Sequence, residues 1–396
     1  MLVDRPDELK LLAEIRAELP AVRQAAYLNC GTAGPLPRRA STAMQSELED
    51  ELTLGRIRPT LMEKLFATND ELRSTLARRI GCAPDEIALS ARTTDGMNVA
   101  LWGLSWQPGD EVLTTRHEHR GLTVPLAALA AARGVAVRYA EWPEDRPDLA
   151  ADAFERAIQA RTRLVALSHV LWTNGTVLPV REIAERAHAR GALVLVDGAQ
   201  AAGGVPLDLS SLGADFYALP GQKWLLGPEG TGAFYAARDA QALCRPTFTG
   251  YLSAADVDQY AANYLPAPGA RRYEVGAPSP ALAIGQLESL RWQAESVDER
   301  WALARISDLA RELRQDLSAL PGVDVRTPQA PETSGILSFR IQGVGAQEAA
   351  KRLQDQGLHL RFLPHPFDSV RVSTGFYLLR EELARLVDAV GEMARS

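Results

Sequence analysis

The chain has 396 residues, of which 46% are hydrophobic and 23% are charged, and its formal net charge at pH 7 is −7. This negative charge, with basic residues scattered along the chain, argues against nucleic acid or an anionic membrane as the main partner. The three cysteines, Cys30, Cys82 and Cys244, are too few and too dispersed for a disulfide framework or a zinc site, and we expect no metal.

Residues 1–7 lack the basic and apolar pattern of a signal peptide, and no apolar run reaches the length of a membrane span. We therefore expect a cytoplasmic protein. The first predicted element is a helix over 9–19, which we expect to pack with the C-terminal part of the chain.

Apolar runs typical of strands alternate with segments of helical periodicity in the first two thirds of the chain. The predicted strands span 111–114, 135–139, 164–167 and 193–196, and the predicted helices span 122–133 and 181–190. Because these strands are apolar throughout, they indicate a parallel sheet covered by helices on both faces. Ligands bind such sheets beyond the carboxyl ends of the strands, where His119, Ser168, His169 and Asp197 fall.

Prolines and glycines crowd together between residues 265 and 280, and we place a domain boundary there. The prediction is a large α/β domain over 20–275 and a smaller α+β domain formed by 1–19 and 276–396. In the smaller domain we expect a helix over 281–320 that breaks near Val297, helices over 346–356 and 380–394, and strands over 335–341, 358–361 and 370–373.

Lys223 lies among apolar residues in the run 219–228, and Asp197 follows the apolar segment 192–196. Burial lowers the pKa of an amine toward neutrality, which a lysine that forms an imine requires. A carboxylate at the end of a buried strand can keep a proton on a pyridine ring, so that the ring withdraws electrons. The pair therefore indicates pyridoxal 5'-phosphate (PLP) as the cofactor.

Two further segments fit a phosphorylated ring cofactor, although each has a simpler explanation. Thr93 and Thr94 open a predicted helix, where hydroxyls and free N–H groups can bind phosphate or simply cap the helix. A zinc site is suggested by two histidines that flank a glutamate, in the run His117, Glu118 and His119. No cysteine or further histidine follows at a spacing typical of zinc ligands. A histidine at a strand end can instead stack on the cofactor ring and move protons near neutral pH, and we favour His119 over His117.

Nucleotide-binding patterns are weak or missing. The run 227–232 is rich in glycine but lacks the ending of a P-loop, and no dinucleotide fingerprint precedes a helix, which disfavours a nicotinamide enzyme. Arg361 and Arg371 lie on neighbouring predicted strands, where they can clamp a substrate carboxylate or lie on the solvated surface.

Together these motifs resemble the class V group of fold-type I PLP enzymes, which includes the cysteine desulfurases. The likeness extends from 27–29 to the final helix and is most specific over 196–201 and 223–232. Within the group the chain most resembles the bacterial cystine C–S lyases, through the runs 99–104, 167–172, 360–361 and 370–371. The resemblance implies the PLP-dependent transferase fold, with a mostly parallel sheet in the large domain, and a homodimer whose two active sites share residues.

The resemblance also implies roles for the residues around the cofactor ring. Lys223 would carry PLP as a Schiff base, and Asp197 would pair with the ring nitrogen. His119 would stack on the ring face, and Gln200 would form a hydrogen bond with the phenolic oxygen.

The phosphate site departs from the family pattern. Thr94 and the backbone of Thr93 would hold the phosphate, and Gln222 can donate a hydrogen bond where relatives have histidine. Pro220 stands where relatives have serine or threonine, and Ala277 where the partner subunit usually supplies a threonine. Each lost charge-assisted hydrogen bond costs about 1.5–3 kcal/mol, so we predict weaker PLP retention than in relatives unless a neighbouring side chain compensates.

The substrate side departs from the desulfurases in particular. Arg371, together with Arg361, would bind the carboxylate of an amino-acid substrate. Desulfurases carry a nucleophilic cysteine shortly before the arginine that matches Arg371, but the run 362–369 contains none. Cys30 lies in the N-terminal loop, and we expect it to be buried and structural. Thiolate attack on a substrate sulfur therefore lacks an agent in that loop.

We therefore predict a C–S lyase that acts by α,β-elimination on cystine or a related sulfur-containing amino acid and gives pyruvate, ammonia and a thiol or persulfide. Lys223 would remove the proton from Cα. An aminotransferase and an isopenicillin N epimerase-like enzyme share the early chemistry and are the alternatives; a desulfurase or a non-catalytic protein of this fold is less favoured. The sequence leaves open the leaving group and whether Trp172, Thr173 or Asn174 faces the cofactor.

Overall fold

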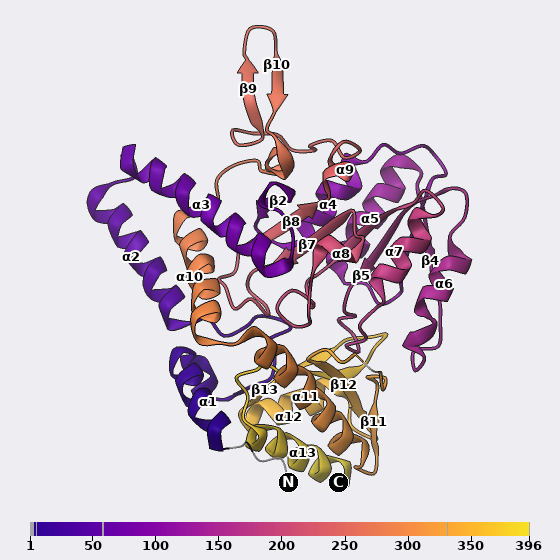
Figure 1. The fold of residues 1–396 in the computed structure, drawn as a ribbon. Helices are drawn as coiled ribbons and strands as arrows, with labels where there is room; N and C mark the ends of the chain where they lie inside the picture. The colour runs from indigo at the N-terminus through magenta and orange to yellow at the C-terminus, as the bar shows by residue number, and fades with distance from the viewer. Residues whose placement is uncertain (1–3, 5, 58, 331, 396) are drawn as a thin grey trace.

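The computed structural model describes residues 4, 6–57, 59–330 and 332–395, so Met1, Leu2, Val3 and Arg5 of the N-terminal run lie outside the described residues. Within these residues the central element is a seven-stranded sheet of order β2-β8-β7-β6-β5-β3-β4 (Figure 1). Its strands are β2 (Ile87–Ser90), β3 (Glu111–Thr114), β4 (Ala136–Tyr139), β5 (Thr162–Ser168), β6 (Leu193–Asp197), β7 (Phe216–Pro220) and β8 (Gly232–Ala236). From β4 to β7 neighbouring strands run parallel, whereas β8 pairs antiparallel with β7 and β2. The predicted mostly parallel α/β architecture is confirmed.

Helices cover both faces of this sheet. Successive residues of a strand point to opposite faces, and in β5 Val165 joins one hydrophobic core while Ala166 joins the other. The Ala166 face packs against α4 (Thr93–Gly103) and α5 (Arg120–Arg133). The opposite face packs against α3 (Pro59–Ile80), α6 (Ala150–Ala157), α7 (Val180–His188) and α10 (Pro280–Ser296). Because both faces are covered, the central strands β5, β6 and β7 are largely apolar, whereas the edge strand β4 is partly exposed and contains Arg138.

The C-terminal unit contains an antiparallel sheet of its own. Its strands, in spatial order, are β11 (Val323–Val325), β12 (Ile336–Ile341), β15 (Ser369–Ser373) and β14 (Arg361–Leu363). The surrounding helices are α11 (Glu299–Ser318), α12 (Ala346–Asp355), α13 (Arg380–Arg395) and α1 (Pro6–Glu18). A short parallel pair, β1 (Ala26–Tyr27) with β13 (Leu358–His359), joins the N-terminal segment to this unit.

Helix α10 links the two units. The predicted helix over 281–320 ends at Ser296 and restarts as α11, so the expected break near Val297 is confirmed. Ala283 and Leu287 of α10 pack in the core of the large sheet, whereas Trp292 packs in the C-terminal core. The domain boundary at residue 275 therefore stays a prediction.

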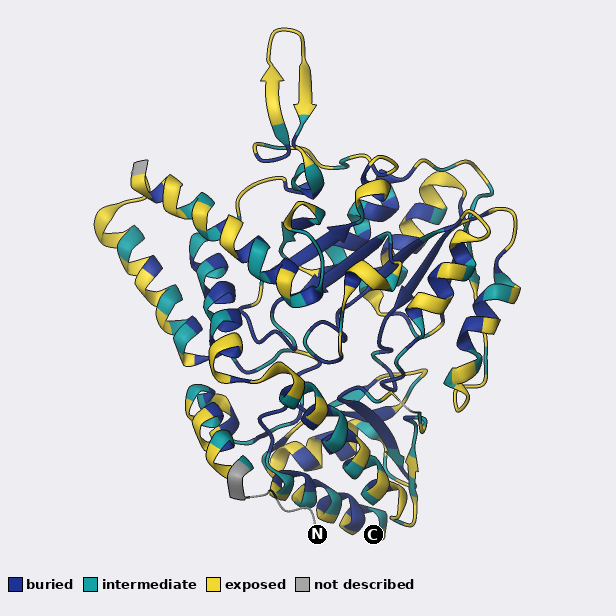
Figure 2. Cartoon of the chain, viewed as in Figure 1, coloured by how far each residue is buried: buried dark blue, intermediate teal, exposed yellow. Residues whose placement is uncertain are grey.

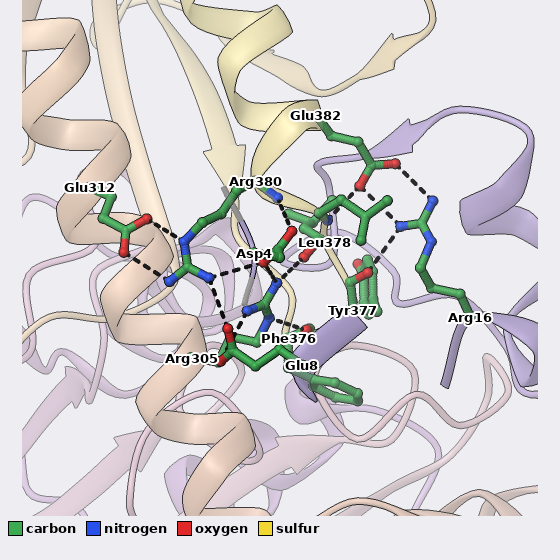
Figure 3. A network of polar contacts seen from close by, with 11 residues as sticks. Asp4, Glu8, Arg16, Arg305, Glu312, Phe376, Tyr377, Leu378, Arg380 and Glu382 are labelled. Carbon is green, nitrogen blue, oxygen red and sulfur yellow. Dashed lines mark hydrogen bonds and ion pairs between the residues drawn. The ribbon is translucent and has the colours of Figure 1, made fainter. Parts of the chain in front are cut away.

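Buried ion pairs attach the N-terminal segment to the C-terminal unit (Figure 3). Arg305 of α11 donates to Asp4 Oδ1 at 2.7 Å, and Arg380 of α13 donates to the same oxygen at 2.9 Å. Arg16 of α1 pairs with Glu382 at 3.0 Å. The N-terminal helix thus packs where the sequence predicts.

Several elements are absent from the sequence-based prediction. Helix α2 (Arg38–Leu54) packs with α10, and its Glu47 forms an ion pair with Lys64 of α3. The hairpin of β9 (Ala254–Asp258) and β10 (Asn263–Pro266) projects from the large domain and is mostly exposed (Figure 2). Short helices α8 (Leu209–Leu212) and α9 (Arg238–Gln241) precede β7 and follow β8. Among the helices that the structure describes, none is both long enough and apolar enough to cross a membrane.

Candidate active site

A cavity of about 220 Å³ brings the predicted site residues together. Its lining includes all of the candidates from the sequence: Thr93, Thr94, His119, Asp197, Gln200, Gln222, Lys223, Arg361 and Arg371. The lining also includes Gly31, Thr32, Arg92, Gly121, Trp172, Ala199 and Pro220. The roles of the individual side chains stay predictions, but their convergence on one cavity is a property of the fold.

The direction of the strands explains this convergence. Asp197 is the last residue of β6, Lys223 follows β7, and His119 follows β3, and these three strands run in the same direction. Strand β2 also runs with β7, because both pair antiparallel with β8, so Thr93 and Thr94 begin α4 at the same edge. The carboxyl edge of a parallel sheet is where open α/β folds bind their ligands.

Lys223 is half-buried and Asp197 is buried, and each shifts the pKa of the other. Burial lowers the pKa of Lys223 from its ordinary 10.5 to about 8, and Asp197 opposes this shift. Burial raises the pKa of Asp197, and the charge of Lys223 and the Ala199 N–H oppose the rise. The Ala199 N–H donates to Asp197 Oδ1 at 2.9 Å. Lys223 therefore has a neutral, nucleophilic fraction near neutral pH.

His119 presents a neutral ring to the cavity. It caps α5, and the Gly121 N–H donates to His119 Nδ1 at 3.1 Å, which places the ring proton on Nε2. Burial and the nearby charge of Lys223 lower the pKa of His119 to about 4. A neutral ring suits the predicted stacking role, whereas the predicted proton transfer near pH 7 gains no support.

His117 lies apart from the cavity lining. His117 Nδ1 is 2.9 Å from Thr173 Oγ1, and its ring lies against Phe367. The choice of His119 over His117 as the histidine nearer the site is therefore consistent with the structure.

Gln200 is held in one orientation. Its Nε2 donates to Gly31 O at 2.8 Å, and its Oε1 accepts from Trp224 Nε1 at 3.0 Å. Since an amide nitrogen has two N–H donors, one remains for a ligand. This geometry fits the predicted hydrogen bond to the phenolic oxygen of PLP.

The expected phosphate end has few donors. Gly121 lets the chain after β3 approach Thr94, because a Cβ there would lie 2.7 Å from Thr94 Oγ1. Gln222 Oε1 is buried and has no hydrogen-bond partner in the described structure, and a half-turn of this amide would present its NH₂ group instead. Pro220 lines the cavity without a donor, and Ala277 is exposed outside it.

Arg361 and Arg371 face one another across β14 and β15, and both contact Thr32. Arg371 Nη2 donates to Thr32 Oγ1 at 3.0 Å, and Arg361 Nη1 donates to the same oxygen at 3.4 Å. Arg371 Nη1 also donates to Trp172 O at 3.2 Å, while its Nε is buried without a partner in the described structure. Burial and the charge of Arg361 lower the pKa of Arg371. An anion bound here would satisfy the free Nε and offset both charges.

Sequence reasoning missed Thr32 and Arg92 and left Trp172 undecided. Trp172 follows β5 and meets the His119 ring edge to face at 5.2 Å, so its position after a strand was the available signal. Thr32 belongs to the loop after β1, where no local pattern marks a binding residue. Arg92 directly precedes the predicted phosphate-binding residue Thr93, and this adjacency was the available signal in the sequence.

The cavity has the groups that PLP requires. Lys223 supplies an amine with a lowered pKa. Asp197 supplies a carboxylate at the carboxyl end of β6, and His119 supplies a neutral ring. The first turn of α4 adds two hydroxyls and free N–H groups for a phosphate. The residues present therefore fit this cofactor.

Comparisons with known proteins agree with this assignment. The sequence profile of the family described as Aminotransferase class-V matches residues 26–386. The chain is 30% identical over 406 residues to a probable cysteine desulfurase 2 of Mycobacterium leprae (strain TN), with 96% of each chain covered. It is 32% identical over 382 residues to an isopenicillin N epimerase of Streptomyces clavuligerus, with 92% of this chain and 93% of the relative covered.

Solved structures show the same fold. The cystine C–S lyase C-DES, in complex with its reaction product cysteine persulfide, matches with a TM-score of 0.88 and 29% identity over 95% of this chain and 99% of that chain. A second C-DES structure, of a lysine-to-alanine mutant with glycine covalently linked to the PLP cofactor, also has a TM-score of 0.88. The chain therefore belongs to the class-V aminotransferase family and is a PLP-dependent enzyme.

Proposed function

We propose that this protein is a C–S lyase that acts by α,β-elimination on cystine or a related sulfur-containing amino acid. The products are pyruvate, ammonia and a thiol or persulfide. The similarity to C-DES supports this choice. The observation that favours a lyase over a desulfurase is that all three cysteines have a raised thiol pKa and lie outside the cavity lining.

None of the three cysteines is suited to attack a substrate sulfur. Cys30, Cys82 and Cys244 do not line the cavity. Burial raises the pKa of each thiol to about 12, so each is protonated at neutral pH. Cys30, the nearest in the chain to lining residues, is 1% exposed, and its Sγ contacts Lys223 O at 3.6 Å. Persulfide transfer to a cysteine requires a thiolate, and the described cavity has none.

The loop that carries the cysteine in desulfurases presents an aromatic residue instead. Phe367 packs against Trp172 with a centroid separation of 5.7 Å and against His117 at the same separation. Arg340 donates to the carbonyl oxygens of Phe367 and Asp368. These contacts hold an apolar ring, rather than a nucleophile, behind the cavity-lining Trp172.

The side chains then divide the work of elimination. Bound PLP supplies an electron-withdrawing ring that stabilises negative charge at Cα. Lys223 would hold the cofactor, and its neutral amine, once the substrate amine has displaced it, would take the proton from Cα. Asp197 would keep the ring nitrogen protonated, and His119 would cover one ring face. Arg371, with Arg361, orients the substrate carboxylate so that the bond to the Cα proton faces Lys223.

We also propose that the protein acts as a homodimer in the cytoplasm. Ile57, beside the α2–α3 turn, and Tyr260, at the tip of the β9–β10 hairpin, are fully exposed apolar side chains. A second copy is the partner that the resemblance implies, and its Ala277 would lie near the neighbouring cavity, at the position where relatives supply a threonine. The free thiols suit a reducing compartment. A single-subunit mass in light scattering would contradict the dimer.

Pyruvate release tests the reaction. Enzyme loaded with PLP is incubated with L-cystine, L-cysteine, a cysteine S-conjugate and L-alanine. We expect pyruvate from cystine or the conjugate, none from alanine, and none from the Lys223→Ala variant. A loaded enzyme that releases no pyruvate from any sulfur substrate would refute the lyase.

Epimerisation is the second candidate, because the isopenicillin N epimerase is 32% identical to this chain. An epimerase returns the proton to the opposite face of Cα and keeps the side chain. Loss of a Cα deuterium with inversion, and without pyruvate, would favour this reaction over elimination.

A further inference from the structure

The expected phosphate end of the cavity is short of positive charge. The phosphate of PLP carries nearly two negative charges at neutral pH. Thr93 and Thr94 offer neutral hydroxyls, and the start of α4 offers about half a unit of positive charge. Pro220 has no donor, and Ala277 is exposed outside the cavity. The remaining charge needs a cation from elsewhere in the lining.

Arg92 is placed to supply it. It is the exposed N-cap residue of α4, forms no capping hydrogen bond through its side chain, directly precedes Thr93 and lines the same cavity. Its backbone is extended, with φ −168° and ψ 163°, and its carbonyl accepts from the Asp95 N–H at 3.2 Å. The hydrogen bond of the Arg92 carbonyl to the first turn therefore fixes the backbone of Arg92 at the start of α4.

The Arg92 guanidinium is uncommitted, unlike those of the other two cavity arginines. Arg361 and Arg371 both donate to Thr32, whereas the Arg92 side chain forms no hydrogen bond or ion pair in the described structure. Asp95, the nearest acid in α4, instead accepts from the Ala91 N–H at 3.1 Å. Among the described lining residues Asp197 is the one acid, so no carboxylate in the wall formed by α4 competes for this cation.

We propose that Arg92 binds the phosphate of PLP and replaces the donors that are missing at Pro220 and Ala277. A guanidinium can donate two parallel N–H bonds to a phosphate, which a threonine cannot. The deficit in PLP retention expected from the sequence is then offset by Arg92. The inference depends on the cofactor and not on which reaction the enzyme catalyses.

The affinity of the apoenzyme for PLP and for pyridoxal, which lacks the phosphate, tests this role. Binding is followed by the imine absorption band, without substrate. We expect Arg92→Ala to weaken PLP binding about tenfold while pyridoxal binding stays unchanged, and Arg92→Lys to recover part of the loss. Arg133→Ala is the matched control, because Arg133 is exposed at the far end of α5 and outside the cavity lining.

Two results would overturn the proposal. One is an unchanged PLP affinity in Arg92→Ala. The other is an equal loss for PLP and pyridoxal, which would mean that Arg92 supports the fold of the site rather than the phosphate. The thermal unfolding temperature of each apo variant, compared with that of the wild-type apoenzyme, shows whether a change in affinity reflects a general loss of structure. A failed pyruvate assay would leave these affinities interpretable.

Discussion

Arg371 Nη2 donates to Thr32 Oγ1 at 3.0 Å, which joins β15 of the C-terminal unit to the loop that follows β1. The same oxygen accepts from Arg361 Nη1 at 3.4 Å, and the Thr32 hydroxyl donates to Asn29 Oδ1 at 2.7 Å. One hydroxyl thus orients two guanidiniums. A substrate carboxylate would meet cations that are already positioned, which reduces the entropy lost on binding.

Replacing Thr32 by valine keeps the shape of the side chain and removes the shared acceptor. We expect KM for the amino acid to rise about tenfold, with a smaller change in kcat and no change in PLP affinity, because a hydrogen bond to a charged group contributes about 1.5–3 kcal/mol. Steady-state kinetics measure the effect, and Thr32→Ser should restore the wild-type KM. An unchanged KM in the valine variant would mean that the arginines need no support from this hydroxyl.

Attachment of PLP to the apoenzyme should depend on pH through Lys223. Burial lowers the pKa of Lys223 to about 8, and only the neutral amine attacks the aldehyde. The rate should therefore rise about tenfold per pH unit below 8 and level off above it, with roughly a tenth of the amine neutral at pH 7. Stopped-flow absorbance measures this rate. A rate that kept rising to pH 10 would indicate an ordinary, solvated lysine.

Replacing Asp197 by asparagine should change that profile in a defined direction. The carboxylate stabilises the ammonium form of Lys223, so its removal should move the midpoint of attachment below pH 8. The ring nitrogen also loses its counter-ion, and we expect elimination to slow by about 10²–10³-fold. Asp197→Glu keeps the charge and should leave the midpoint nearer to that of the wild type. A midpoint that rose in the asparagine variant would contradict the assigned pairing.

Arg305 should contribute more to stability than a surface arginine of the same helix. It is 3% exposed and donates to Asp4, Phe376 O and Leu378 O (Figure 3). Arg305→Leu should lower the free energy of unfolding by about 3 kcal/mol, because it leaves buried acceptors unpaired. Arg311→Leu, at an exposed position of α11, should lower it by less than about 0.5 kcal/mol. Urea unfolding compares the two.

The stability difference between the Arg305→Leu variant and the wild type should also depend on pH. Burial tends to raise the pKa of Asp4, but the hydrogen bonds and charges of Arg305 and Arg380 outweigh it and lower the pKa below 3.8. A lowered carboxyl pKa adds stability above the unfolded-state pKa, and this stability is lost as the pH falls through the folded-state value. The difference between the two proteins should therefore shrink below about pH 4. A difference that stayed constant to pH 2 would exclude Asp4 as the main partner.

The sequence by itself determined the local part of this architecture. Strands that are buried on both faces are mostly apolar, so β3, β5 and β6 could be located without a structure, and Asp197 could be placed at a strand end. Lys223 could be recognised because a cation among apolar residues is rare unless it has a chemical use. The C-terminal helices were also predictable from their period, including the break near Val297.

Only the tertiary structure decided which distant segments complete the cavity. Thr32 reaches Arg371 because β1 pairs with β13, a contact between segments far apart in the chain that no local pattern encodes. The neutral state of His119 follows from burial and from the charge of Lys223, and both depend on packing. Propensity and periodicity report on neighbours within a few residues, whereas the electrostatics of a site depend on every charge and dipole within several ångströms, whatever its position in the sequence.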